Sequence, residues 1–166
     1  MFPYDCIRDI PERYVFIPAM TLGALVTSSK IDPSTINAYL QTDYCVAGNI
    51  PLILRTGIPN DTLAMLYKQH RTNSAMFITA CNPYSRDIGE TANAERQAKL
   101  QLELTRRNLP FLEGIGKYPS GSWPEEPSYL VLSVSLEEAK TIGKKYEQNA
   151  IIWCGADTIP ELILLR

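Results

Sequence analysis

The sequence has few of the residues from which metal and nucleophile sites are built. It holds one histidine, His70, among 166 residues, and no C-x-x-C pair joins its four cysteines, Cys6, Cys45, Cys81 and Cys154. Zinc sites with C-x-x-C or H-E-x-x-H spacing are therefore excluded for this chain alone. A histidine-activated nucleophile would have to use His70, and no G-x-S-x-G segment exists to present a serine. We expect neither a metal nor a cofactor.

The sequence also lacks a long apolar run and a strong excess of either charge. Residues 14–26 are uncharged and mainly apolar, but they are far fewer than the roughly 20 residues that cross a bilayer as a helix. The residues before them include acidic side chains, which secretory leaders lack. The formal charge is −2, so the chain has no overall positive field that would attract a phosphate backbone. We expect a cytoplasmic protein with reduced cysteines, no membrane anchor and no nucleic-acid partner.

The length fits one folding unit, since domains run to about 100–200 residues. We assign residues 32–166 to a single α+β domain and residues 1–31 to an N-terminal extension, with Met20 as an alternative initiator. Caps and periodicity predict helices at about 32–41, 60–70, 91–108 and 135–146. Strands are predicted at 44–47, 51–56, 75–80, 111–115, 129–134, 150–154 and 161–165.

The order of elements over residues 75–154 is strand, helix, strand, strand, helix, strand, as in ferredoxin-like folds. We therefore predict a two-layer α+β sandwich with a ferredoxin-like βαββαβ core and flanking elements. On the long helix, Ala94, Ala98 and Leu102 form the predicted apolar stripe, with Leu100 and Leu104 beside it, and charged residues such as Arg96 form a solvated face. The run 114–117 does not fit a phosphate-binding loop and predicts a turn.

A first polar cluster, residues 79–85, follows a predicted apolar strand. Because Asn82 precedes Pro83, we expect extended geometry at Asn82, with its amide held at the strand exit and the hydroxyl of Ser85 nearby. In the alternative interpretation, this is a turn whose side chains bond only to backbone.

A second cluster, residues 123–128, is a proline-stiffened loop that leads into the next strand. Trp123 could stack on a ring or sugar, while Glu126 accepts hydrogen bonds or acts as acid or base. Alternatively, Trp123 covers the core and the glutamates are solvated.

A third cluster combines amide side chains from two helix ends. Gln148 and Asn149 precede a buried strand, where they could bind a planar ligand or cap the preceding helix. Asn93 lies in the first turn of the long helix, where it could hold a ligand or bond to the helix start.

Several of these segments together resemble the bacterial domain of unknown function 3293 family, whose members are small single-domain proteins. The segments are Thr42-Asp43-Tyr44, Thr79-Ala80-x-Asn82-Pro83, Asn93-Ala94 with Arg96-Gln97-Ala98, Trp123-Pro124-x-Glu126-Pro127-Ser128 and Gln148-Asn149-Ala150. The resemblance supplies no activity. It implies that one site in space contains Asn82, Asn93, Trp123, Glu126, Ser128 and Gln148.

Two functions follow from these clusters. In the first, a small polar ligand, which could be nucleotide-like, binds among Asn82, Ser85, Asn93, Trp123, Ser128 and Gln148, with Glu126 as acid or base. In the second, the chain is a non-catalytic module that binds a protein partner through the Trp123 loop or a sheet edge. The terminal strand, residues 161–165, is an edge through which a homodimer could form. A concave pocket would favour the ligand, and a flat apolar patch the protein partner.

Overall fold

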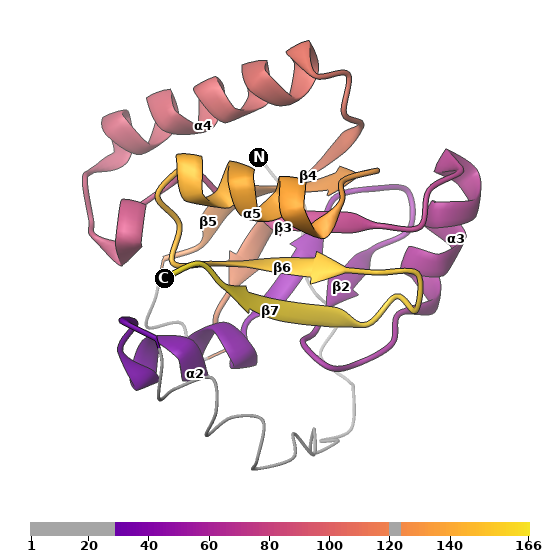
Figure 1. Ribbon diagram of the computed structural model, residues 1–166, viewed down its shortest axis with the longest axis horizontal. Coiled ribbons are helices and arrows are strands. Elements are labelled where there is room, and N and C mark those ends of the chain that lie inside the picture. The colour runs from indigo at the N-terminus through magenta and orange to yellow at the C-terminus, as the bar shows by residue number, and fades with distance from the viewer. Residues whose placement is uncertain (1–28, 120–123) are drawn as a thin grey trace.

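The computed structural model describes residues 29–119 and 124–166. They form a curled, seven-stranded antiparallel sheet with four α-helices, which makes the protein α+β as predicted (Figure 1). The helices are α2 (Pro33–Gln41), α3 (Asp61–His70), α4 (Glu90–Arg106) and α5 (Leu136–Lys145), and a 3₁₀ turn, η1, spans Pro83–Ser85. The strands are β1 (Asp43–Val46), β2 (Leu52–Leu54), β3 (Ala75–Ile78), β4 (Phe111–Lys117), β5 (Glu126–Leu132), β6 (Ala150–Cys154) and β7 (Pro160–Leu164).

Side-chain caps fix the starts of three helices where the sequence predicts them. The carboxylate of Asp32 accepts a hydrogen bond from the backbone N–H of Ser34 at the start of α2. Asn60 and Ser135 do the same for the first turns of α3 and α5. These caps satisfy backbone N–H groups that lack a partner within the helix, so local sequence alone sets these boundaries.

The strand order is β2-β1-β4-β5-β3-β6-β7, and each neighbouring pair is antiparallel. β2 and β7 therefore lie at the two edges, as predicted for the terminal strand. β3 lies between β5 and β6 and runs antiparallel to both. Its C-terminal end consequently meets the N-terminal ends of both neighbours, although these three points are far apart in the sequence.

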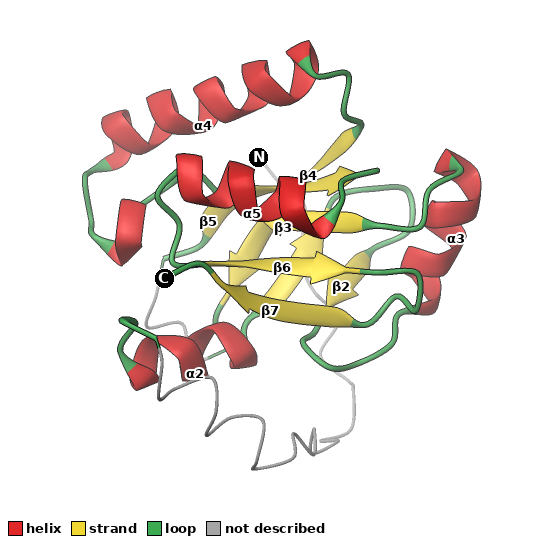
Figure 2. Ribbon diagram, viewed as in Figure 1, coloured by secondary structure: helices red, strands yellow, loops and turns green. Residues whose placement is uncertain are grey.

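Helices pack on both faces of the sheet (Figure 2). Along β3, Met76 and Ile78 pack in a cluster with residues of α4 and α5, whereas Ala75 and Phe77 pack in a second cluster with residues of α2 and α3. This alternation follows from the two-residue period of a strand. α2 and α3, which flank the predicted core in the sequence, therefore pack on the face opposite α4 and α5.

Three local predictions are wrong. On α4, Leu100 and Leu104 beside the predicted stripe are buried together with Gln97, while Leu102 of the stripe itself is 49% exposed. The run 114–117 is not a turn but continues β4. β5 begins at Glu126 rather than at residue 129, so part of the predicted loop belongs to the sheet.

No helix in the described part of the chain is long and apolar enough to cross a bilayer. The apolar stretch at 14–26 and the alternative start at Met20 lie outside the described residues.

Candidate functional site

A cavity of about 1080 Å³ opens where η1, the start of α4 and the N-terminal ends of β5 and β6 meet. Six of the residues predicted from the sequence line it: Asn82, Ser85, Asn93, Glu126, Ser128 and Gln148. The sheet brings them together, because the C-terminal end of β3 lies beside the starts of β5 and β6. Trp123, the seventh predicted residue, lies outside the described residues.

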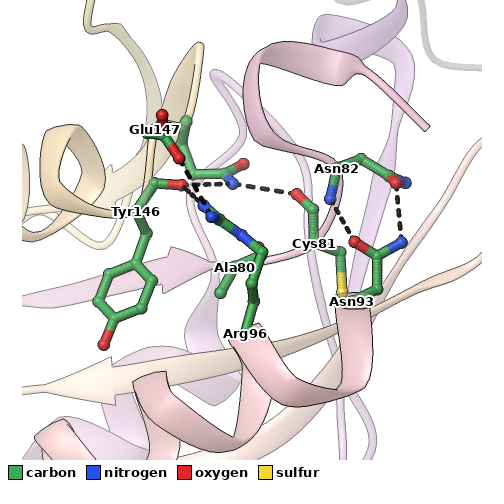
Figure 3. Close-up of polar contacts among 8 residues, drawn as sticks. Ala80, Cys81, Asn82, Asn93, Arg96, Tyr146 and Glu147 are labelled. Atoms are coloured by element: carbon green, nitrogen blue, oxygen red, sulfur yellow. Dashed lines mark hydrogen bonds and ion pairs between the residues drawn. The ribbon is translucent and has the colours of Figure 1, made fainter. Parts of the chain in front are cut away.

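Asn82 and Asn93 hold each other through two hydrogen bonds (Figure 3). The backbone N–H of Asn82 donates to Oδ1 of Asn93, and Nδ2 of Asn93 donates to Oδ1 of Asn82, both at 2.8 Å. Asn82 is left-handed, with φ 45° and ψ 66°, so the predicted extended geometry is wrong. Asparagine tolerates this region better than most residues, and the bonds from α4 hold it there against the preference that Pro83 imposes.

The side-chain amide of Asn82 also donates a hydrogen bond to Glu126. Nδ2 of Asn82 donates to Oε1 of Glu126 at 2.6 Å. Burial raises the pKa of the Glu126 carboxyl above its usual value, and the Asn82 bond opposes this rise without cancelling it. The second oxygen, Oε2, has no hydrogen-bond partner among residues 29–119 and 124–166. A carboxyl group so placed can accept a hydrogen bond when ionised and donate one when protonated.

Ser128 and Gln148 use their polar groups mainly inside the fold. The hydroxyl of Ser128 is buried and donates to the backbone carbonyl of Glu126 at 3.0 Å. Nε2 of Gln148 donates to the carbonyls of Cys81 and Tyr146, at 3.0 and 3.2 Å. Both residues therefore shape the wall of the cavity by fixing the backbone that carries the other groups.

Ser85 lies in a smaller polar cluster that includes α2. Its Oγ is 2.7 Å from the hydroxyl of Tyr39 and accepts from Nδ2 of Asn149 at 3.0 Å. The sequence predicts that Asn149 caps a helix or binds a ligand, whereas its side chain ties η1 to the start of β6.

Arg96, predicted to lie on a solvated face, is instead a bridge between three segments (Figure 3). Its guanidinium donates to the carbonyl of Ala80 at 2.8 Å and to that of Tyr146 at 2.7 Å, and pairs with Glu147 at 3.1 Å. Its side chain is 23% exposed. The sequence does not predict this role, because the alternating charges around Arg96 resemble those around the solvated arginines of α4.

Gln97 is a second residue that sequence reasoning missed. It lines the cavity with 7% of its surface exposed, and its Oε1 accepts from the backbone N–H of Ala80 at 2.9 Å. The sequence signals its burial only through spacing. Gln97 precedes Leu100 and Leu104 by about one and two helical turns, and so shares the face of α4 that these leucines bury.

Cys81 also lines the cavity, but its surroundings do not activate it. Burial raises the pKa of its thiol, and the charge of Glu126 acts in the same direction. A nucleophilic cysteine needs the opposite, a thiolate favoured by nearby positive charge. Among the described residues, no group of three or more His, Cys, Asp or Glu side chains is placed to hold a metal ion.

Comparison with known proteins supports the resemblance over part of the chain. The model of a family described as a protein of unknown function, DUF3293, matches residues 78–151. This segment contains Asn82, Asn93, Glu126 and Gln148, whereas the predicted motif at 42–44 lies outside it. No curated protein and no solved structure matches the chain. The chain therefore resembles this family over the segment that builds most of the cavity, and the match brings no activity with it.

Proposed function

We propose that the cavity binds a small polar ligand, with Glu126 as the group that exchanges hydrogen bonds or a proton with it. The observation that carries this proposal is the chain of contacts from Asn93 through Asn82 to Glu126. Each member fixes the next, and the chain ends at the Glu126 carboxyl, whose second oxygen, Oε2, has no hydrogen-bond partner in the described part of the molecule. Polar groups held in place before a ligand arrives are typical of binding sites.

The shape of the site favours a ligand over a protein partner. The groups converge on a concave space of about 1080 Å³, slightly above the range of roughly 300–1,000 Å³ for small-molecule sites. The concave shape keeps a ligand as the first hypothesis for this surface. Trp123, on which part of the partner hypothesis depends, lies outside the described residues.

The proposal extends to the core that carries the site. We infer that residues 75–154 form a ferredoxin-like core, which the order β4-β5-β3-β6 and the antiparallel pairing of its members support. In this order the strand ends that carry the site lie at one end of the sheet. A cytoplasmic location belongs to the same proposal and is supported by the buried thiols of Cys81 and Cys154.

The test is a thermal-shift screen of the full chain against sugars, amino acids, polyamines and nucleosides, repeated with Glu126→Gln. Ligands that bind the native state raise its stability by mass action, by about 2.7 kcal/mol at a hundredfold excess over Kd. We expect a shift in wild type that is lost in Glu126→Gln. The matched control is Glu95→Gln, which removes the same charge from an exposed position on α4 outside the cavity.

A shift that survives Glu126→Gln would place the ligand elsewhere on the molecule. The absence of a shift with every compound, in a protein that unfolds cooperatively, would remove the ligand hypothesis for this library. Capture of a partner through the Trp123 loop would then be the next experiment.

A further inference from the structure

The amide of Gln97 lies in the wall of the cavity and carries a hydrogen-bond donor without a partner among the described residues. Its Oε1 already accepts from the N–H of Ala80, and this bond fixes which side of the amide faces the backbone. Its Nε2 is buried and has no hydrogen-bond partner in the described part of the chain. Buried donors are nearly always paired in folded proteins. An acceptor on a ligand would satisfy this one.

The phenol of Tyr129 is the neighbour that comes near this amide from β5. Burial raises the pKa of Tyr129, and the Gln97 side chain opposes that rise, which places the two polar groups close to each other. The contact nevertheless falls short of hydrogen-bond geometry, since Nε2 remains unpaired. Tyr129 also lines the cavity, so a ligand that reaches Nε2 would lie against its ring.

The charge of the lining argues against an anionic ligand. Lysine, arginine and histidine are missing from the described residues around the cavity, while Asp87, Glu90, Glu125 and Glu126 contribute carboxylates. Glu125 forms an ion pair with Lys117 at 3.2 Å, and the other three have no ion pair with a described residue. A phosphate would enter this field against repulsion and find no arginine or lysine of the lining to receive it.

Aromatic side chains complete the lining and suit a planar ring. Tyr39 and Tyr118 border the same space as Gln97 and Glu126. Aromatic faces stack on heterocycles in a way that tolerates different rings. The cavity thus combines stacking surface, a buried donor and a carboxyl acceptor.

We propose that the ligand is an uncharged nitrogen heterocycle that offers an acceptor to Nε2 of Gln97 and an N–H donor to Oε2 of Glu126, as a nucleobase edge does. The site then takes nucleobases and nucleosides and rejects their phosphates. This inference rests on the proposed function and deepens it by naming the ligand class.

The first experiment uses the wild-type chain and needs no variant. Adenosine, guanosine, cytidine and uridine are titrated by calorimetry beside their 5′-monophosphates. We expect at least one nucleoside to bind, and its monophosphate to bind about tenfold or more weakly because of the carboxylates. Raising the ionic strength should narrow this difference, since salt screens charge repulsion.

The second experiment changes the donor and keeps the shape. Gln97→Glu retains an oxygen for the N–H of Ala80 and replaces Nε2 with an oxygen that faces the ligand's acceptor. We expect nucleoside affinity to fall about tenfold or more. Gln69→Glu makes the same charge change on the exposed end of α3, outside the cavity, and should leave affinity within about twofold. Gln97→Met provides a second variant without a donor should the glutamate prevent folding.

The outcomes separate this inference from the proposed function. Loss of nucleoside binding in a folded Gln97 variant, together with rejection of the monophosphates, supports it. Equal or tighter binding of the monophosphates overturns it, and so does full affinity in a Gln97 variant. Binding of a sugar or amino acid but no nucleoside, abolished by Glu126→Gln, also overturns it while the proposed function stands. If no compound binds, both fall.

Discussion

Replacing Arg96 with methionine should cost more stability than replacing an exposed arginine of α4, because its guanidinium joins three segments. The change removes two charge-assisted hydrogen bonds, to the carbonyls of Ala80 and Tyr146, and one ion pair with Glu147. Hydrogen bonds to charged groups contribute about 1.5–3 kcal/mol each, whereas an ion pair this exposed contributes about 0–1 kcal/mol. The carbonyl of Tyr146 keeps the amide of Gln148 as a donor, and the methionine stem recovers some packing. We therefore expect a loss of about 2–4 kcal/mol.

Urea unfolding at neutral pH measures this loss, and three further variants divide it. Glu147→Gln removes the ion pair alone and should cost less than about 1 kcal/mol, since the Glu147 side chain is 47% exposed. Arg96→Lys keeps the positive charge but not the planar guanidinium that donates to two carbonyls at once. It should lose at least half as much stability as Arg96→Met. Arg106→Met, on the exposed end of the same helix, should stay within about 0.5 kcal/mol. A methionine variant no less stable than Glu147→Gln would refute the bridging role of Arg96.

Three shorter predictions concern the sheet and the cavity. Gly114→Ala should destabilise the fold by about 1–3 kcal/mol, because a Cβ there would lie 2.6 Å from the carbonyl oxygen of Cys45 and 2.7 Å from the ring of Phe77; Gly116→Ala, with 3.8 Å to its nearest neighbour, should change the urea midpoint little. The folded state raises the pKa of Glu126 and therefore binds the carboxyl proton more tightly than the unfolded chain does. The unfolding free energy of wild type should consequently fall, relative to that of Glu126→Gln, as pH rises from about 4 to about 8. A wild-type stability that instead rises relative to the variant would contradict burial as the cause of the raised pKa. If two chains pair through the edge strand β7, light scattering should give the mass of a dimer. A monomer mass at every protein concentration would rule out this homodimer.

The elements of the fold were largely predictable because their signals are local. A cap at Asn60 or Ser135 acts within one helical turn, and the alternation of Leu52 and Leu54 with Ile53 is visible in three residues. The buried face of α4 was predictable only in part, through Leu100 and Leu104. Leu102 is more apolar than Gln97, but α4 is oriented by the packing of Leu100 and Leu104, and this rotation buries Gln97.

The candidate site was predictable as a set of segments but not as a geometry. Amide and carboxyl residues at strand ends indicate where polar groups gather, and six of those residues line one cavity. The sequence does not show that Nδ2 of Asn82 reaches Glu126, because that contact depends on a left-handed Asn82 and on the pairing of β3 with β5. Arg96 was missed for the same reason, since its acceptors are backbone carbonyls distant in sequence.

The backbone of the 82–85 segment allows one more test of whether the site is held in place before a ligand binds. Asn82, Tyr84 and Ser85 all have positive φ, with Ser85 at 58°, and each such residue with a side chain costs about 1–2 kcal/mol relative to glycine. Ser85→Ala and Ser85→Gly both remove the hydroxyl that bonds to Tyr39 and Asn149, so the difference between them isolates the backbone. In ordinary positions alanine is the more stable of the two by about 0.5–1 kcal/mol. Here we expect the order to reverse, with Ser85→Gly more stable by about 1 kcal/mol in urea unfolding. If alanine is the more stable, residue 85 is not left-handed, and the side-chain bonds around η1 hold no strained backbone in place.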